Sequence, residues 1–165
     1  MHIEIQRVTE FSSGCEHPPG QDNPSETQTE GSEKRGRRPK ILIVDDSLAA
    51  WLRFAREILT EGGFRVHACD APEALELFKE SYHEIDLVIT DLQMPGLDGI
   101  ELAAELLKIN PALPVVLTSA AQFEMSSEKL QSLGIRDFLP KPWERERLFS
   151  VLQQALSSTR SEEPR

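Results

Sequence analysis

The chain has little of what marks secreted and membrane proteins. It holds only two cysteines, Cys15 and Cys69, at no spacing typical of a disulfide framework or a metal site. No run of about 18 apolar residues is present, so the sequence predicts no membrane-spanning helix. The stretch that begins at Met1 lacks the basic and apolar regions of a signal peptide. Together these absences predict a cytoplasmic protein of a reducing compartment.

Positive charge is also scarce. The 18 Lys and Arg residues face 28 Asp and Glu residues, which gives a formal net charge of -10. A chain this acidic is not expected to bind nucleic acid or an anionic membrane through its overall charge. One exception, residues 34–40, carries five basic residues in seven and faintly resembles a minor-groove hook, although an additional arginine interrupts the Gly-Arg-Pro core. A solvated linker is the favoured interpretation, and a DNA contact is the alternative.

Large apolar residues are missing from Ser12 to Pro39. Such a segment buries too little surface to offset the entropy of ordering, so we expect residues 1–39 to form a disordered extension ending in the basic linker. Apolar alternation within the first eleven positions leaves a short strand or docking element open as an alternative. Residues 40–158 are then expected to form one folded domain, followed by a short tail at residues 159–165.

Apolar runs and helical patterns alternate from residue 40 onward, and turn residues separate them. Because nearly every run is apolar throughout, we predict an α/β fold: a doubly wound five-stranded parallel sheet flanked by five helices. The third and fourth helices are expected at residues 99–109 and 122–133. The strands are expected at residues 41–44, 64–69, 87–90, 115–119 and 137–139.

The helices have recognisable starts. We expect Ser47 to cap the first helix and Asp98 to cap the third. Asp70 is expected to cap the second helix, with Glu73 returning the second bond of a capping box. The apolar residues of the first expected helix fall at helical spacing: Trp51, Phe54, Ala55, Ile58 and Leu59.

Polar side chains follow four of the expected strands. In a parallel sheet the carboxyl ends of the strands lie along one edge, which would bring together Asp45, Asp46, Asp91, Ser119 and Lys141. Three converging carboxylates require a cation, and oxygen ligands suit Mg2+, with Mn2+ as an alternative. A lysine and a hydroxyl nearby would hold the oxygens of a phosphoryl group. These residues predict a site for phosphoryl chemistry, without deciding which acid is a ligand and which a nucleophile.

Four motifs carry a family resemblance. Residues 43–47, 91–99, 114–120 and 138–142 read Ile-Val-Asp-Asp-Ser, Asp-Leu-Gln-Met-Pro-Gly-Leu-Asp-Gly, Pro-Val-Val-Leu-Thr-Ser-Ala and Phe-Leu-Pro-Lys-Pro. In this order and spacing they resemble the CheY-like receiver domain of bacterial response regulators in two-component signalling. The resemblance covers about residues 40–158. It implies a protein that accepts a phosphoryl group and takes part in its own phosphorylation and dephosphorylation, rather than an enzyme.

The resemblance also assigns roles. Asp91 would accept the phosphoryl group from the phosphohistidine of a histidine kinase. Asp45 and Asp46 would help bind Mg2+, together with the main-chain carbonyl of Gln93, and Lys141 would contact the phosphoryl oxygens.

Two adjacent hydroxyls, Thr118 and Ser119, end the fourth expected strand, whereas the family has a single switch hydroxyl there. The spacing from Lys141 selects Ser119, and neighbours in a strand point to opposite faces. Phe138 matches an aromatic position whose rotamer follows the switch hydroxyl, with plain core packing as the alternative.

Two positions that affect the phosphoryl lifetime in this family are occupied by Gln93 and Ala121. The methyl group of Ala121 cannot orient an attacking water molecule, although the amide of Gln93 can. We therefore expect slow self-hydrolysis.

The expected partners are a sensor histidine kinase or a histidine phosphotransfer protein, and a downstream protein at the surface of the fourth helix, fifth strand and fifth helix. A homodimer formed on phosphorylation is a further option. Three alternatives remain: an interaction module that works without phosphorylation, a receiver fragment of a hybrid histidine kinase, and an aspartyl-phosphate hydrolase. The last requires an Asp-x-Asp pattern, whereas this chain has Asp45-Asp46-Ser47.

Overall fold

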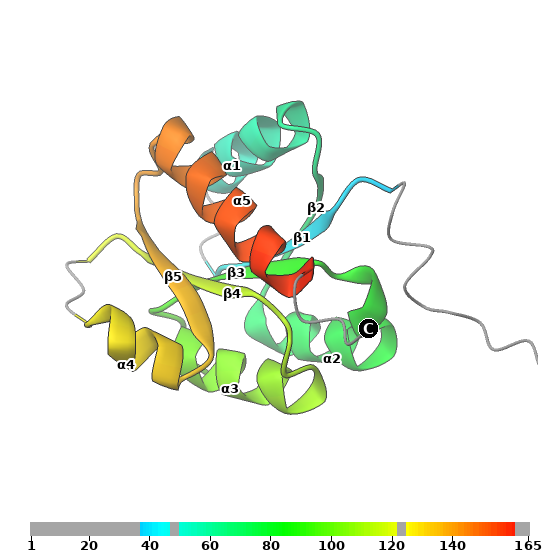
Figure 1. Ribbon diagram of the computed structural model, residues 1–165, viewed down its shortest axis with the longest axis vertical. Coiled ribbons are helices and arrows are strands. Elements are labelled where there is room, and N and C mark those ends of the chain that lie inside the picture. The colour runs from blue at the N-terminus through cyan, green and yellow to red at the C-terminus, as the bar shows by residue number, and fades with distance from the viewer. Residues whose placement is uncertain (1–36, 47–49, 122–124, 161–165) are drawn as a thin grey trace, which may run out of the picture. The chain divides into compact units, whose positions relative to one another are not determined.

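A computed structural model (Figure 1) describes residues 37–46, 50–121 and 125–160. The chain divides into two compact units, Met1–Arg35 and Gly36–Arg165, and all described residues belong to the second. The expected disordered extension, the Ser47 cap and most of the expected tail therefore lie outside the described residues. Among the described residues, no helix is long and apolar enough to cross a membrane.

The predicted α/β architecture is confirmed. The described part of the chain forms five strands and five α-helices, with one short 3-10 helix, η2, at Tyr82–Glu84. The strands are β1 (Lys40–Val44), β2 (Arg65–Cys69), β3 (Leu87–Asp91), β4 (Val115–Ser119) and β5 (Ile135–Pro140). The α-helices are α1 (Ala50–Glu61), α2 (Ala71–Ser81), α3 (Gly99–Ile109), α4 (Ser127–Ser132) and α5 (Arg145–Arg160).

The strands form one parallel sheet in the order β2-β1-β3-β4-β5. Helices α1 and α5 cover one face, and α2, α3 and α4 cover the other (Figure 1). The strand order changes direction between β1 and β3, which is where open α/β sheets bind ligands outside the carboxyl ends of the strands. Asp45 and Asp91 stand on either side of this point.

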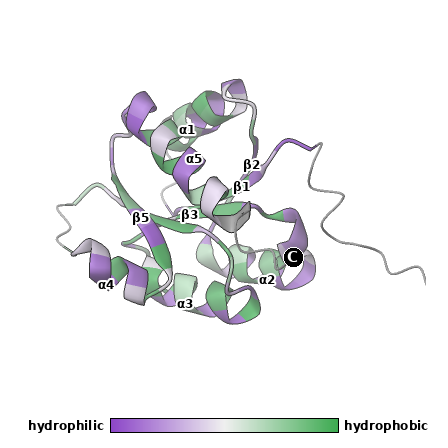
Figure 2. Ribbon diagram, in the orientation of Figure 1, coloured by the Kyte–Doolittle hydropathy of each residue, from purple (hydrophilic) through white to green (hydrophobic). Residues whose placement is uncertain are grey.

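Burial of the central strands on both faces explains their unbroken apolar runs. All five residues of β3 and all five of β4 are buried. Alternate residues of a strand enter different cores: Ile41 and Ile43 pack with α1 and α5, whereas Leu42 and Val44 pack with α2 and α3. Figure 2 shows hydrophobic residues along these strands. A strand in a sheet that helices cover on both sides is therefore expected to have no polar face.

Phe54 falls at the helical spacing of the apolar residues of α1, yet it is 52% exposed and does not join their buried face. Successive helical residues are rotated by about 100°. The buried arc is formed by Leu52, Ala55, Ile58 and Leu59, and Phe54 falls beyond its margin. The side chain of Trp51 lies outside the described residues.

The cap of α3 is confirmed and the capping box of α2 is not. Asp98 Oδ1 accepts hydrogen bonds from the backbone N–H groups of Ile100 and Glu101. In α2, Asp70 Oδ1 accepts from Glu73 N at 2.9 Å, as predicted. The carboxylate of Glu73, however, lies 3.1 Å from Nε2 of His67 on the neighbouring strand instead of returning to the helix start. A tertiary partner has replaced the local one.

Two element bounds also differ from expectation. Helix α4 spans Ser127–Ser132 and is capped by Ser126, whose Oγ accepts from Lys129 N; residues 122–124 of the predicted helix lie outside the described ones. Strand β5 begins at Ile135, because this buried residue pairs with Val115 before the register shifts.

Candidate functional site

The acids expected at the carboxyl edge of the sheet do converge. Asp45, Asp46 and Asp91 each offer a carboxylate oxygen within 4.8 Å of the others. Backbone pairing fixes the surrounding strands, since Leu92 N donates to the carbonyl of Thr118 and Lys141 N donates to the carbonyl of Ser119, both at 2.8 Å. The edge thus gathers side chains that are separated by up to 96 residues in sequence.

Lys141 lies between two buried carboxylates. Its Nζ is 2.6 Å from Asp45 Oδ2 and 3.3 Å from Asp91 Oδ2. The side chains of all three are nearly buried, whereas Asp46 is exposed. One lysine therefore faces three carboxylates, and the negative charge is only partly offset. Such a pocket favours an added cation.

Asp91 is the least satisfied of these acids. Its Oδ1 is buried and has no hydrogen-bond partner among the described residues. Burial raises the pKa of Asp91, Lys141 acts in the opposite direction, and the charge of Asp45 adds to the increase. A buried, unpartnered carboxylate oxygen is costly unless something else engages it. The donor set is oxygen only, which fits a hard divalent cation held by carboxylates and water.

The two adjacent hydroxyls have different partners. Thr118 Oγ1 donates to the carbonyl of Leu139 at 2.6 Å and accepts from Trp143 Nε1 at 2.9 Å. Ser119 Oγ accepts from the backbone N–H of Ala121 at 3.1 Å. Thr118 is thus engaged by the fifth strand and the segment before α5, while Ser119 faces the loop that follows β4. This geometry agrees with choosing Ser119, whose switch role stays a prediction.

Replacing Thr118 by valine is expected to lower the free energy of unfolding by about 1 kcal/mol. The substitution keeps the branched shape but removes two buried hydrogen bonds, from Thr118 Oγ1 to the carbonyl of Leu139 and from Trp143 Nε1 to Thr118 Oγ1. Urea denaturation should show the loss. Thr118→Val should cost less in a Trp143→Phe background, where no indole N–H needs an acceptor, and an equal cost in both backgrounds would contradict the hydrogen-bond argument.

The remaining predicted residues surround the pocket less closely. Phe138 is partly buried and packs against the core beneath α4. Gln93 and Ala121 are exposed, in the loops after β3 and β4. The proposed roles of the Phe138 rotamer, the Gln93 carbonyl and the Ala121 methyl group stay predictions.

In the sequence, Gly99 is only the expected first residue of the third helix. A Cβ atom at this position would lie 2.2 Å from the carbonyl oxygen of Asp91 and 3.0 Å from the Cα of Leu92. Gly99 N also donates to the carbonyl of Leu92 at 3.1 Å. The start of α3 therefore packs directly on the backbone that carries Asp91. No local sequence pattern signals such a tertiary approach.

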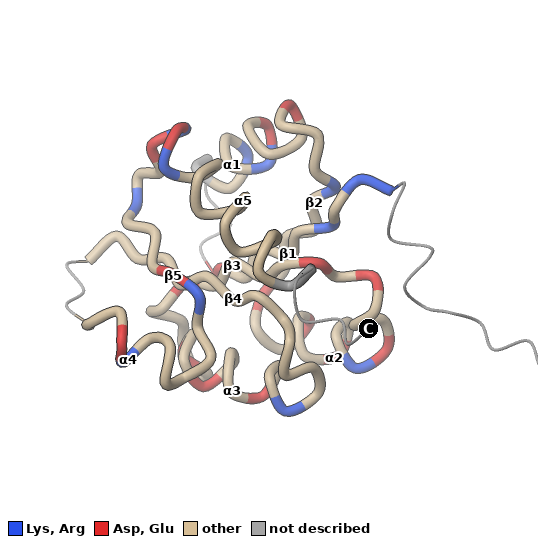
Figure 3. The backbone as a smooth tube through the Cα atoms, viewed as in Figure 1, with Lys and Arg blue, Asp and Glu red and all other residues tan. Residues whose placement is uncertain are grey.

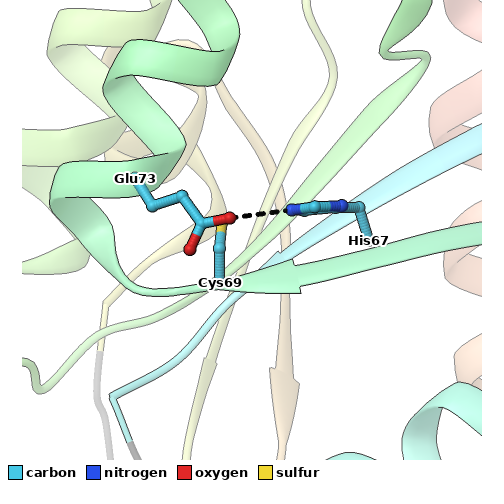
Figure 4. Close-up of side chains that lie close together, drawn as sticks. All are labelled: His67, Cys69 and Glu73. Atoms are coloured by element: carbon cyan, nitrogen blue, oxygen red, sulfur yellow. Dashed lines mark hydrogen bonds and ion pairs between the residues drawn. The ribbon is translucent and has the colours of Figure 1, made fainter.

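A second group of polar side chains was also missed. His67, Cys69 and Glu73, to which no ligand spacing had been assigned, offer donor atoms within 4.8 Å of one another (Figure 4). The available signal was the spacing of His67 and Cys69, because residues two apart in a strand share a face. Burial, with the charges of Glu73 and Asp70, raises the pKa of Cys69 to about 12.

Two of the three described basic residues of the linker are paired with acids, while Arg38 is exposed. Arg37 lies 2.9 Å from Asp86, and Lys40 Nζ lies 3.0 Å from Glu84. Figure 3 shows a basic stretch where the chain enters β1. The expectation of a purely solvated linker was therefore wrong for Arg37 and Lys40. Both are held against the segment that precedes β3.

Fold and site together define a class: an open α/β domain that gathers acids, a hydroxyl and a lysine at its topological switch point. The chain belongs to the response regulator receiver domain family, whose sequence pattern matches residues 41–153. It is thus a signalling protein of the two-component response regulator kind.

Individual relatives support the same family assignment. The chain is 35% identical over 122 residues to the chemotaxis protein CheY of Bacillus subtilis, covering 72% of this chain and 98% of that protein. It is 36% identical to the transcriptional regulatory protein ZraR of Klebsiella oxytoca, covering 78% of this chain but 29% of that protein. A response regulator receiver domain protein from Clostridium thermocellum superposes with a TM-score of 0.70 at 27% identity, over 76% of this chain and 99% of that one.

Proposed function

We propose that Asp91 accepts a phosphoryl group from the phosphohistidine of a histidine kinase or a histidine phosphotransfer protein. The observation that carries the proposal is the carboxylate of Asp91 at the switch point of the sheet: its Oδ1 is buried without a hydrogen-bond partner among the described residues, and its Oδ2 lies 3.3 Å from Lys141 Nζ. A carboxylate oxygen of Asp91 would attack the phosphorus, forming an O–P bond as the N–P bond breaks. The electron pair of that bond leaves with the imidazole, which a proton then neutralises.

Asp45, Asp46, Asp91 and the main-chain carbonyl of Gln93 would hold Mg2+, with Mn2+ as the alternative. When bound, the ion supplies positive charge that offsets the charge of the phosphoryl oxygens. Lys141 contacts Asp45 and Asp91, and its ammonium group would hold a phosphoryl oxygen on Asp91. The chain's own residues thus orient the acceptor and neutralise part of the charge.

The output would be a protein contact. Ser119 lies at the end of β4, and its hydroxyl, which accepts from the N–H of Ala121, would donate its O–H to a phosphoryl oxygen. Phe138, on the adjacent strand, would follow this movement and alter the surface formed by α4, β5 and α5. A downstream protein, or a second copy of the chain on phosphorylation, would bind there. The scarcity of cysteine favours the cytoplasm as the compartment of these contacts.

The acyl phosphate on Asp91 is expected to persist for minutes rather than seconds. Ala121 is exposed but offers only a methyl group to an attacking water molecule, which leaves Gln93 as the nearby amide. Loss of radiolabelled phosphate after removal of the donor measures the lifetime. Ala121→Gln should shorten it if water positioning is limiting; a wild-type half-life of seconds would contradict the prediction.

The proposal is tested by uptake of acid-labile phosphate from acetyl phosphate, with and without Mg2+. Wild type is expected to take up phosphate only with the metal, and Asp91→Asn to show only background. Asp46→Asn should raise the Mg2+ concentration needed for uptake without removing the acceptor. Uptake that survives in Asp91→Asn would assign another acceptor, and no uptake in folded wild type would favour an interaction module that works without phosphorylation.

A further inference from the structure

We propose that His67, Cys69 and Glu73 form a second cation site, for a borderline-soft divalent ion of the Zn2+ kind. The site lies at the outer edge of the sheet, on β2 and the first turn of α2, and shares no residue with the acidic pocket (Figure 4). It does not depend on the proposed phosphoryl transfer.

The backbone holds the three positions in place. In β2, His67 pairs with Leu42 and Cys69 with Val44 of the neighbouring strand, so both side chains project from one face of a fixed strand. Glu73 is fixed in the first turn of α2, where its N–H donates to Asp70 Oδ1 at 2.9 Å. The three donors are therefore brought together by hydrogen-bonded secondary structure.

The side chains need little movement to enclose an ion. Zinc bonds of roughly 2.0–2.3 Å place neighbouring ligands of a tetrahedral site about 3.5 Å apart. Nε2 of His67 and Oε1 of Glu73 are already 3.1 Å apart, and all three donors lie within 4.8 Å. The side chains of His67 and Glu73 are 40% and 57% exposed, so both can adjust while the buried Cys69 stays in place.

The donor atoms differ in kind from those of the acidic pocket. Imidazole nitrogen, thiolate sulfur and carboxylate oxygen suit Zn2+, whereas the three carboxylates of Asp45, Asp46 and Asp91 suit Mg2+. Three protein ligands also leave the fourth position of a tetrahedral site to water or to a partner's side chain. The two sites should thus select different ions.

The local charge favours a cation. Without one, the thiol of Cys69 keeps its proton, because burial and the carboxylates of Glu73 and Asp70 oppose the thiolate. The carboxylates attract a dication, but the dication must displace this thiol proton, so its binding should strengthen as the pH rises. The competing explanation is an exposed His67–Glu73 ion pair next to a core cysteine, an arrangement that contributes little to stability.

Co2+ titration of the full-length chain separates the two explanations, because a thiolate ligand gives Co2+ an intense sulfur-to-metal charge-transfer band. The chain has two cysteines, so a Cys15→Ser background leaves Cys69 as the one thiol. We expect this variant to give the band at one ion per chain. Zn2+ should displace the Co2+, and excess Mg2+ should not.

Three variants in the same background test the ligands. Cys69→Ser should abolish the band, and His67→Gln and Glu73→Gln should each weaken Co2+ binding at least tenfold. Asp46→Asn, in the acidic pocket, should leave the charge-transfer band unchanged. Thermal unfolding adds a second readout, since Zn2+ should raise the melting temperature of the Cys15→Ser protein and not that of His67→Gln. His67→Gln alters an exposed side chain, so it is expected to fold even if Cys69→Ser does not.

The proposal is overturned if the Cys15→Ser protein gives no charge-transfer band. It is also overturned if His67→Gln and Glu73→Gln both bind Co2+ as tightly as their parent, because the thiol would then act with ligands elsewhere in the chain.

Discussion

Replacing Gly99 by alanine is expected to lower the free energy of unfolding by about 3 kcal/mol. The added Cβ would lie 2.2 Å from the carbonyl oxygen of Asp91 and 3.0 Å from both its carbonyl carbon and the Cα of Leu92. All three atoms belong to the backbone, so no rotamer change relieves the contact. Either α3 moves away from the sheet or the end of β3 is displaced together with Asp91.

Urea denaturation measures the loss, and divalent-cation binding by the folded variant measures the displacement of Asp91. The matched control is Gly63→Ala, at a glycine with φ of +88° where an added Cβ would meet no atom within 4 Å. In Gly63→Ala the left-handed conformation alone should lower the free energy of unfolding by about 1 kcal/mol, and cation binding should be unchanged. Equal effects of the two substitutions would show that the approach of Gly99 to Asp91 is not tight.

The sequence predicted the sheet and the acidic pocket for the same reason. A strand covered by helices on both faces must be apolar along its length, so runs such as residues 87–90 are conspicuous. The polar residue at which each run stops then marks the carboxyl end of a strand. Because parallel strands end at one edge, Asp45 and Asp91 could be placed together without any knowledge of their distance.

Contacts between elements were not predictable in this way. Phe54 satisfies the helical spacing of α1, and only the position of the helix on the sheet shows that the buried arc excludes it. The carboxylate of Glu73 has a local partner available at the start of α2 but pairs with His67 across to β2. Gly99 likewise resembles an ordinary helix start until the distance to Asp91 is known. Each of these three features depends on packing between elements, which local sequence patterns do not encode.

Replacing Asp91 by asparagine is expected to stabilise the metal-free protein at neutral pH by about 1–3 kcal/mol. The Asp91 residue is 8% exposed and its Oδ1 has no hydrogen-bond partner among the described residues. Asp45 adds a second negative charge that Lys141 only partly offsets. Asparagine keeps the shape of the side chain and a polar atom at the unpartnered position, but it removes the buried charge, which is the larger part of the penalty. Function and stability are thus opposed at the proposed acceptor.

The stability penalty of ionised Asp91 should depend on pH, because burial changes the pKa of this carboxyl group on folding. Burial raises the pKa of Asp91 in the folded protein above its usual value of 3.8. As the pH rises from about 4, the unfolded chain therefore loses this proton first, and wild type loses stability until the folded pKa is passed. Below about pH 4 both states hold the proton and the penalty disappears. The stability difference between Asp91→Asn and wild type should be largest at neutral pH and vanish in acid.

Urea denaturation at neutral and acidic pH measures this difference, with Asp46→Asn as the control. Asp46 belongs to the same trio but is exposed, so its substitution should change stability by less than about 0.5 kcal/mol. Mg2+ should stabilise wild type more than Asp91→Asn, because an ion that binds only the folded state shifts the unfolding equilibrium. A less stable Asp91→Asn at neutral pH would mean that attraction to Lys141 outweighs burial. Lys141 would then offset the negative charge of the pocket without a bound cation.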